Sequence, residues 1–232
     1  MQTKTYGLIC PITKACELLE SRWTIPILAE IWSGSSRFND IRRGVGNISS
    51  ALLSKRLKEM QANGLIERID DKGTGGVEYV RTEMAIALEP TLHSMAEWAQ
   101  RFIDAEFAIS ETNISALIWK LRRAVISSEF PPRRVVIRFH FSDATLDFGT
   151  CWLLAQPGAE VELCTSVPDF DVDLYVETSV KSISAVLMAR SSISREIDEG
   201  RLFLSGDARM IRTIGNWLRE SDYADVEGIA TI

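Results

Sequence analysis

Residues 49–64 read Ser-Ser-Ala-Leu-Leu-Ser-Lys-Arg-Leu-Lys-Glu-Met-Gln-Ala-Asn-Gly, and this stretch predicts the helix on which the fold depends. Leu53, Leu57 and Met60 recur at helical spacing, so they form one apolar stripe. Ser49 is a favourable N-cap, and Gly64 is typical of the position that follows a helix. The opposite face carries small residues followed by basic ones: Ser50, Ala51, Ser54, Lys55 and Lys58, with Arg56 at its edge.

The outer face of this predicted helix suits DNA. A helix of about 15 residues is roughly 22 Å long and fits the major groove of B-DNA, which is ~12 Å wide. The chain has a formal net charge of -6, yet residues 37–58 hold six basic side chains against Asp40 alone. Such a cluster indicates a phosphate-facing surface. The competing interpretation is a solvated face, because most runs of charge are simply hydrated.

The flanking sequence predicts a winged helix. Three shorter helices are expected at residues 11–20, 23–32 and 38–43. After Gly64, residues 65–69 and 77–81 alternate as strands, and the glycine-rich segment between them is the tip of a hairpin. Helices followed by such a hairpin make a mainly α, winged helix-turn-helix domain.

Several short motifs resemble those of the HxlR-type bacterial winged-helix regulators. They run in order over residues 8–102 without large gaps: Cys10-Pro11, Arg22-Trp23-Thr24 with Ile27-Leu28, Arg37-Phe38-Asn39-Asp40-Ile41, Ile48-Ser49, Leu53-Ser54-Lys55-Arg56-Leu57, Asn63-Gly64-Leu65-Ile66-Glu67-Arg68, and Glu78-Tyr79 with Thr82-Glu83. The resemblance implies a homodimeric transcriptional regulator whose partner is double-stranded DNA.

With residues 49–63 as the recognition helix, we expect Ser50, Ser54 and Lys55 to reach base edges, with Ser49 beside them at the cap. Phosphate contacts position a protein without reading sequence. For these we expect the basic side chains around the helix and at the tip of the wing: Arg37, Arg42, Arg43, Arg56, Lys58 and Lys72. Repression by promoter occlusion is the commoner outcome for small winged helices, and activation is the alternative.

A further helix is expected after its cap, Thr82, and Pro90 must kink or restart it. Its apolar stripe exceeds what one small core can cover: Leu92, Met95, Ala99, Phe102 and Ile103, with Trp98 near the edge. Packing on its own domain competes with a dimer interface, and the resemblance favours the interface, formed with the N-terminal helix. A two-fold dimer would place two recognition helices about 34 Å apart and so predicts an inverted-repeat operator.

The four cysteines lie at positions 10, 16, 151 and 164, which forms neither a disulfide scaffold nor a C-x-x-C metal pair. This pattern indicates a reducing cytoplasm and no metal site. Some members of the family sense oxidants through a thiol matching Cys10, and a thiol near a helix start has a lowered pKa. The alternative is a silent thiol beside the dimer interface. Cys16 falls on an apolar face, which predicts a core position.

The second half of the chain predicts an α+β domain, so we divide the protein into residues 1–110 and 111–232. Helices are expected at 114–125, 180–188, 193–199 and 208–218, and strands at 135–141, 146–155, 161–167, 172–177 and 201–205. The first three strands form an antiparallel meander. The result is an antiparallel-rich sheet of about five strands, covered by helices on one face.

The order helix, meander, helices, and then Leu202-Phe203-Leu204-Ser205-Gly206-Asp207 before the last helix resembles the sterol-carrier-protein fold. This resemblance implies an apolar tunnel, and hence a hydrophobic small-molecule effector that changes operator affinity. The candidate lining residues are Phe139, Phe148, Trp152, Leu174, Met188 and Trp217. A filled core is the alternative, since aromatic side chains under helices usually pack with one another.

Composition and motifs exclude other classes. With 232 residues, 46% of them apolar, and 26 Lys and Arg against 32 Asp and Glu, the chain is expected to fold as a cytoplasmic protein. No stretch approaches ~20 consecutive apolar residues, so no membrane span is expected. Nucleophile elbows, phosphate-binding loops and dinucleotide fingerprints are missing, so neither catalysis nor a cofactor is expected. The alternative function is a lipid or small-molecule carrier that uses its first domain for dimerisation.

Overall fold

The computed structural model describes residues 5–70, 73, 76–144 and 149–232. Contacts between Cα atoms divide the chain into two units, residues 1–93 and 94–232. One helix, α5 (Glu83–Phe102), runs across this division. The predicted domain boundary at residue 110 stays a prediction.

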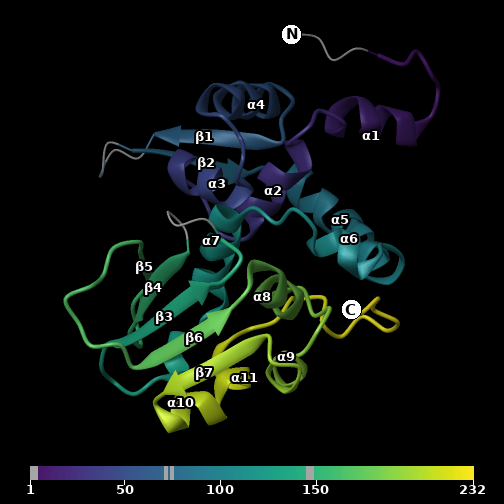
Figure 1. Ribbon diagram of the computed structural model, residues 1–232. Coiled ribbons are helices and arrows are strands. Elements are labelled where there is room, and N and C mark those ends of the chain that lie inside the picture. Colours follow the sequence, from purple (N-terminus) through teal and green to yellow (C-terminus); the bar gives the residue numbers. More distant parts are fainter. Residues whose placement is uncertain (1–4, 71–72, 74–75, 145–148) are drawn as a thin grey trace. The chain divides into compact units, whose positions relative to one another are not determined.

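In the described part of the chain, the first unit contains a helical cluster and a β-hairpin. The helices that precede the hairpin are α1 (Pro11–Leu19), α2 (Thr24–Trp32), α3 (Phe38–Val45) and α4 (Ser50–Ala62). Strands β1 (Ile66–Asp70) and β2 (Val77–Arg81) pair antiparallel, with Ile66 opposite Arg81. Figure 1 shows α4 lying beside β1. The predicted winged helix is therefore confirmed.

Apolar side chains of α2, α3, α4 and the hairpin form the core of the first unit. The predicted stripe of α4, Leu53, Leu57 and Met60, is buried in this core. The helix is followed by Gly64, whose φ is 74°, and the N–H of Leu65 donates to the carbonyl of Met60 at 2.9 Å. Because glycine adopts positive φ at little cost, Gly64 ends the helix and directs the chain into β1.

Helix α5 begins where the sequence predicts it. The Oγ1 of Thr82 accepts a hydrogen bond from the N–H of Ala85 at 3.3 Å. The helix continues through Pro90 to Phe102, so the proline does not restart it. Ala85 is fully buried, and Leu88 packs against the core of the first unit.

The second unit combines helices with a mixed sheet. Short helices α6 (Ala105–Ile109), α7 (Ile114–Ala124) and the 3-10 turn η1 (Ser127–Glu129) precede the strands β3 (Val135–Phe141), β4 (Thr150–Ala155), β5 (Glu162–Cys164) and β6 (Leu174–Thr178). Then follow α8 (Val180–Leu187), α9 (Ile193–Asp198), β7 (Leu202–Gly206), α10 (Ala208–Arg212) and α11 (Ile214–Trp217).

The strand order is β5-β4-β3-β6-β7, and β3 is parallel to β6 while the other pairs are antiparallel (Figure 1). The predicted meander β3-β4-β5 is confirmed. Alternate side chains of the strands meet the apolar sides of α7, α8 and α11 in one large core, whose central members include Phe139, Leu121, Ile183 and Trp217. Because successive strand residues point to opposite faces, the helices cover the face that carries Phe139.

Three elements differ from the sequence-based expectation. Strand β5 stops at Cys164, before the exposed Val167. The last helix is broken into α10 and α11 at Thr213, whose φ of -109° and ψ of 19° leave the helical region. The short helix α6 has no counterpart in the prediction. Residues 145–148 of the predicted second strand lie outside the described residues.

The Gly206-Asp207 step has a clear physical basis. Gly206 has a φ of 122°, and a Cβ at this position would lie 2.3 Å from the carbonyl oxygen of Asp173. The N–H of Asp207 donates to the same oxygen at 2.8 Å. The carboxylate of Asp207 then accepts from the N–H groups of Arg209 and Met210 and caps α10, as predicted. Only glycine lets β7 approach Asp173 so closely.

Candidate DNA-binding surface

The candidate surface is built on α4. The hydroxyl of Ser49 accepts from the N–H of Leu52 at 3.2 Å, which confirms the predicted N-cap. Burial of the apolar stripe turns the opposite side of the helix outward. The residues predicted for this side are all exposed, and we call them the recognition face: Ser50, Ala51, Ser54, Lys55 and Lys58.

Acidic side chains lie close to two of the predicted phosphate contacts. The Nη1 of Arg43 is 3.2 Å from the Oδ1 of Asp40, one helical turn earlier in α3. The Nε of Arg37 is 3.8 Å from the Oε1 of Glu78 in β2. Exposed pairs of this kind contribute little free energy, so both cations remain able to exchange a carboxylate for a phosphate.

Arg56 is largely buried and contacts other parts of the protein. Its side chain is only 17% exposed, and its Nη1 forms a close ion pair with Glu59. Its Nε donates to the carbonyl of Arg22 at 2.9 Å, in the turn between α1 and α2. Arg56 therefore ties α4 to that turn, and its predicted contact with phosphate stays a prediction.

Sequence reasoning missed the acidic partners of these cations. Glu59 follows Lys55 by four residues and Arg56 by three, a helical spacing that signals ion pairs, and the Nζ of Lys55 does lie 4.0 Å from Glu59. Glu78 is different, because it comes from a strand far along the chain. No spacing in the sequence indicates that it reaches Arg37.

Arg42 and Lys58 have no carboxylate partner within the described part of the chain. The Nη1 of Arg42 donates instead to the Oγ of Ser50 at 3.0 Å. Lys58 is exposed near the middle of α4. Lys72, predicted at the tip of the wing, lies outside the described residues.

Cys10 is half-buried and occupies the N-cap position of α1 with extended backbone. Hydrogen bonds from the backbone and side chain of Thr13, and from the backbone of Ile12, lower the pKa of this thiol below its ordinary value. Its redox role stays a prediction. Cys16 is exposed, so the core position expected for it is wrong.

The predicted effector-pocket residues that the structure describes lie on both faces of the sheet. Phe139, Leu174 and Trp217 fill the main core of the second unit. Met188 is half-buried just after α8, and Phe148 lies outside the described residues. Burial of Phe139, Leu174 and Trp217 agrees with the filled core that the sequence left open as the alternative.

Trp152 lies on the other face of the sheet. The register of β3 and β4 pairs Phe139 with Cys151, so Cys151 shares its face and Trp152 points the opposite way. There Trp152 packs with Val136 and Leu154. Its grouping with Phe139 was wrong, because the alternation of a strand fixes faces only once its pairing register is known.

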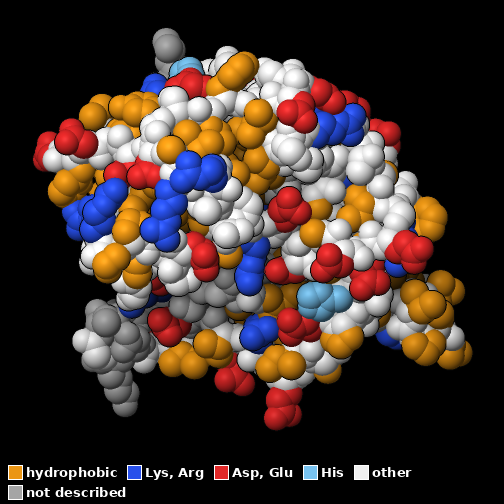
Figure 2. All heavy atoms as spheres, turned by 90° about the horizontal axis from the view of Figure 1, so that it is seen from below, with side chains coloured by type: hydrophobic (Ala, Val, Ile, Leu, Met, Phe, Trp, Pro, Cys, Tyr) orange, Lys and Arg blue, Asp and Glu red, His pale blue; other side chains and the backbone are white. Residues whose placement is uncertain are grey.

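The described residues contain no group of three or more His, Cys, Asp or Glu side chains placed to hold a metal ion. Among them, no helix combines the length and hydrophobicity needed to cross a bilayer. On the face shown in Figure 2, basic, acidic and hydrophobic side chains are interspersed.

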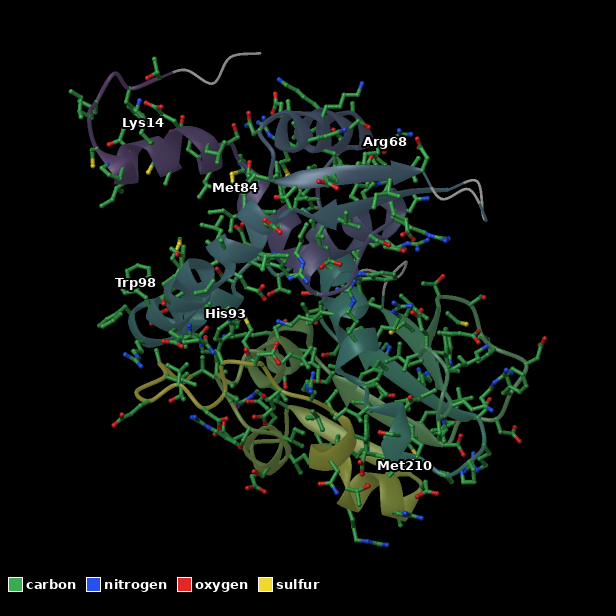
Figure 3. The ribbon with its side chains drawn as sticks, turned by 180° about the vertical axis from the view of Figure 1, so that it is seen from behind. Lys14, Arg68, Met84, His93, Trp98 and Met210 are labelled. Carbon is green, nitrogen blue, oxygen red and sulfur yellow. The ribbon has the colours of Figure 1, made fainter. Side chains whose placement is uncertain are left out.

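Large apolar side chains are exposed along α5. Trp98 and Phe102 are 58% and 69% exposed, and their ring centroids lie 6.1 Å apart. Met84 and Met95 on the same helix are also exposed, whereas Leu92 is buried. Figure 3 shows Trp98 projecting away from α5. An apolar surface of this kind is typical of a protein–protein interface.

The first half of the chain is similar in sequence to known proteins. Residues 18–107 match the family model described as HxlR-like helix-turn-helix. The HTH-type transcriptional regulator YvaP of Bacillus subtilis is 35% identical over 101 residues, which are 43% of this chain and 94% of YvaP. YodB of the same organism, also an HTH-type transcriptional regulator, is 31% identical over 105 residues, 44% of this chain and 94% of YodB. The structure of reduced YodB matches with a TM-score of 0.38 and 34% identity over 41% of this chain and 96% of that one.

Proposed function

Because the chain belongs to the HxlR-like helix-turn-helix family and is a DNA-binding transcriptional regulator, we propose that it binds an inverted-repeat operator as a homodimer through α4. The recognition face carries this proposal. Its serines and lysines are exposed on a helix whose other side is fixed in the core by Leu53 and Leu57. Such a helix meets a groove as a rigid element, so little order has to be gained on binding.

The exposed side chains of α4 and of the end of α3 differ in length and charge. Ser50, Ser54 and Lys55 face the base edges, because they lie in the first turns of the helix, where recognition helices contact bases. Arg43 and Lys58 contact phosphates on either side of the groove. Each phosphate neutralised releases condensed counterions, so these residues set the salt dependence of the affinity.

The exposed side of α5 supports a two-fold dimer. Trp98 and Phe102 are large apolar side chains that a second copy of the chain would remove from water. Two-fold symmetry places two copies of α4 about 34 Å apart, one helical turn of DNA. A dimer bound at a promoter blocks RNA polymerase from that site. We therefore propose that the protein acts as a repressor.

The test compares Lys58→Ala with Ser54→Ala in the full-length chain. We expect Lys58→Ala to weaken binding to selected and random DNA by the same factor, and to lower the slope of log affinity against log salt by about 1. Ser54→Ala should instead change the order of preference among operator sequences. Affinities are measured by titration of labelled duplexes at two salt concentrations.

Two results would contradict the proposal. If both variants reduce binding to selected and random DNA equally, the division between base and phosphate contacts is wrong. If the parent shows only a diffuse shift that salt abolishes, the chain lacks sequence-specific binding, and the carrier function suggested by the second unit takes its place.

A further inference from the structure

We propose that Arg42 and Ser50 act together as a reader of guanine in the major groove, a role that rests on the proposed function and refines it. The sequence assigned Arg42 to phosphate and Ser50 to a base edge as separate contacts. The hydrogen bond from the Nη1 of Arg42 to the Oγ of Ser50, 3.0 Å long, joins them into one unit.

The backbone between the two helices brings these residues together. Arg42 lies in the last turn of α3, and Ser50 is the first residue of α4. Between them, Gly46 has a φ of 84°, and its N–H donates to the carbonyl of Arg42 at 3.1 Å. Glycine adopts this positive φ at little cost, and the chain reverses its direction there. The start of the recognition helix therefore lies beside the guanidinium of Arg42.

The charge of Arg42 is not neutralised by a carboxylate in the described part of the chain. Arg37 and Arg43 have acidic neighbours, and Arg56 is held by Glu59 and a backbone carbonyl. Arg42 instead makes a side-chain hydrogen bond to a neutral hydroxyl, within the described residues. Its positive charge therefore stays available to an acceptor on DNA.

The combined chemistry of the pair is that of hydrogen-bond donors. The guanidinium has further N–H groups in a planar fork, and the Ser50 hydroxyl keeps its own hydrogen after accepting from Arg42. In the major groove, guanine presents two acceptors side by side, O6 and N7, whereas adenine sets an N6 donor beside its N7. A donor pair with a fixed guanidinium therefore favours guanine.

The bond to Ser50 also restricts the Arg42 side chain before DNA arrives. A free arginine loses much rotamer entropy on binding, and a guanidinium already held in place loses less. Lysine keeps the charge but not the fork, so Arg42→Lys removes the bidentate contact while leaving the electrostatic attraction. Ser50→Ala removes the residue that positions Arg42.

The test selects binding sites from a random duplex library with the full-length chain. The parent, Arg42→Lys, Ser50→Ala and the control Arg43→Lys are compared, and unchanged thermal unfolding shows that each variant folds. We expect the parent to enrich a guanine at one position of each half-site. Arg42→Lys and Ser50→Ala should both lower the preference at that same position by about 10-fold, and Arg43→Lys should not.

A chemical substitution separates base from phosphate. Replacing the selected guanine with 7-deazaguanine removes its N7 acceptor, which should weaken the parent and have little further effect on Arg42→Lys. If Arg42→Lys weakens selected and random DNA by one factor, Arg42 contacts phosphate and the inference is wrong. It is also wrong if the two variants alter different positions. If the parent selects no sequence at all, the proposed function itself fails.

Discussion

Glu196 in α9 is a fully buried carboxylate that keeps its charge. Burial raises its pKa, but hydrogen bonds from Arg201, Ser182 and Ser191 outweigh this effect and lower the pKa to about 2. The Nε and Nη2 of Arg201 lie 2.7 Å from the two carboxylate oxygens, and the Oγ of Ser182 lies 2.6 Å from one of them. The network joins α8, α9 and the start of β7.

A depressed pKa makes this residue a source of stability that depends on pH. The folded-state pKa lies below the ordinary value of 4.5, so the stabilisation is complete above that pH and disappears as the pH falls towards 2. Glu196→Gln should therefore lower the free energy of unfolding by about 2 kcal/mol at pH 7 and by much less at pH 3. Urea unfolding at both pH values measures the difference. The exposed Glu162 in β5, changed to Gln, is the control. An equal loss at both pH values for Glu196→Gln would refute the assignment.

A buried arginine holds the end of α5. Arg190 is 1% exposed, and its guanidinium donates to the carbonyls of Ala99, Gln100, Ile103 and Ala230 at distances between 2.8 and 3.2 Å. The last carbonyls of a helix have no partner within the helix, and a cation there also meets the negative end of its dipole. The C-terminal residues join the same cluster, since the N–H of Ile232 donates to the carbonyl of Arg190 at 3.1 Å.

Replacing this arginine should loosen both segments. Arg190→Met removes the side-chain donors of the Ile103 and Ala230 carbonyls, and one of the two donors at Ala99 and at Gln100. We therefore expect a loss of about 3 kcal/mol in the free energy of unfolding. Hydrogen exchange at the amides of Ile103, Ala230 and Ile232 should become faster. Arg195→Met is the matched control, because that side chain is 45% exposed and pairs with Glu199 on the surface. Unchanged protection at these three amides would show that Arg190 does not hold them.

Some features of the fold are determined by residues that are close together in the sequence, and others are not. Helix α4 was predictable because Ser49, its apolar stripe and Gly64 all act within a few residues of one another. The contact of Arg190 with Gln100 joins residues 90 positions apart, and no local pattern encodes it. The face of Trp152 depended on strand register, which is set by tertiary pairing. Within the candidate site, exposure of the recognition face followed from helical spacing, whereas Glu78 and the structural position of Arg56 required the fold.

The proposed two-fold symmetry is a property of the assembly and not of one chain. A single α4 contacts few base pairs, and two half-sites bound by one rigid dimer gain affinity by about 100-fold or more through effective concentration. We therefore expect the apolar surface of α5 to influence operator affinity through the proposed dimer. Trp98 and Phe102 are its most exposed aromatic side chains.

Charge placed on this surface should separate the subunits. Trp98→Glu and Phe102→Glu each put a carboxylate where the proposed interface excludes water, so we expect sedimentation equilibrium to show a dimer for the parent and monomers for both variants. Phe203→Glu is the control, because Phe203 is 60% exposed on β7 and lies in another element. The monomeric variants should retain the affinity of the parent for one half-site and lose its preference for the inverted repeat. A parent that sediments as a monomer would contradict the proposed assembly, and variants that remain dimeric would place the interface elsewhere.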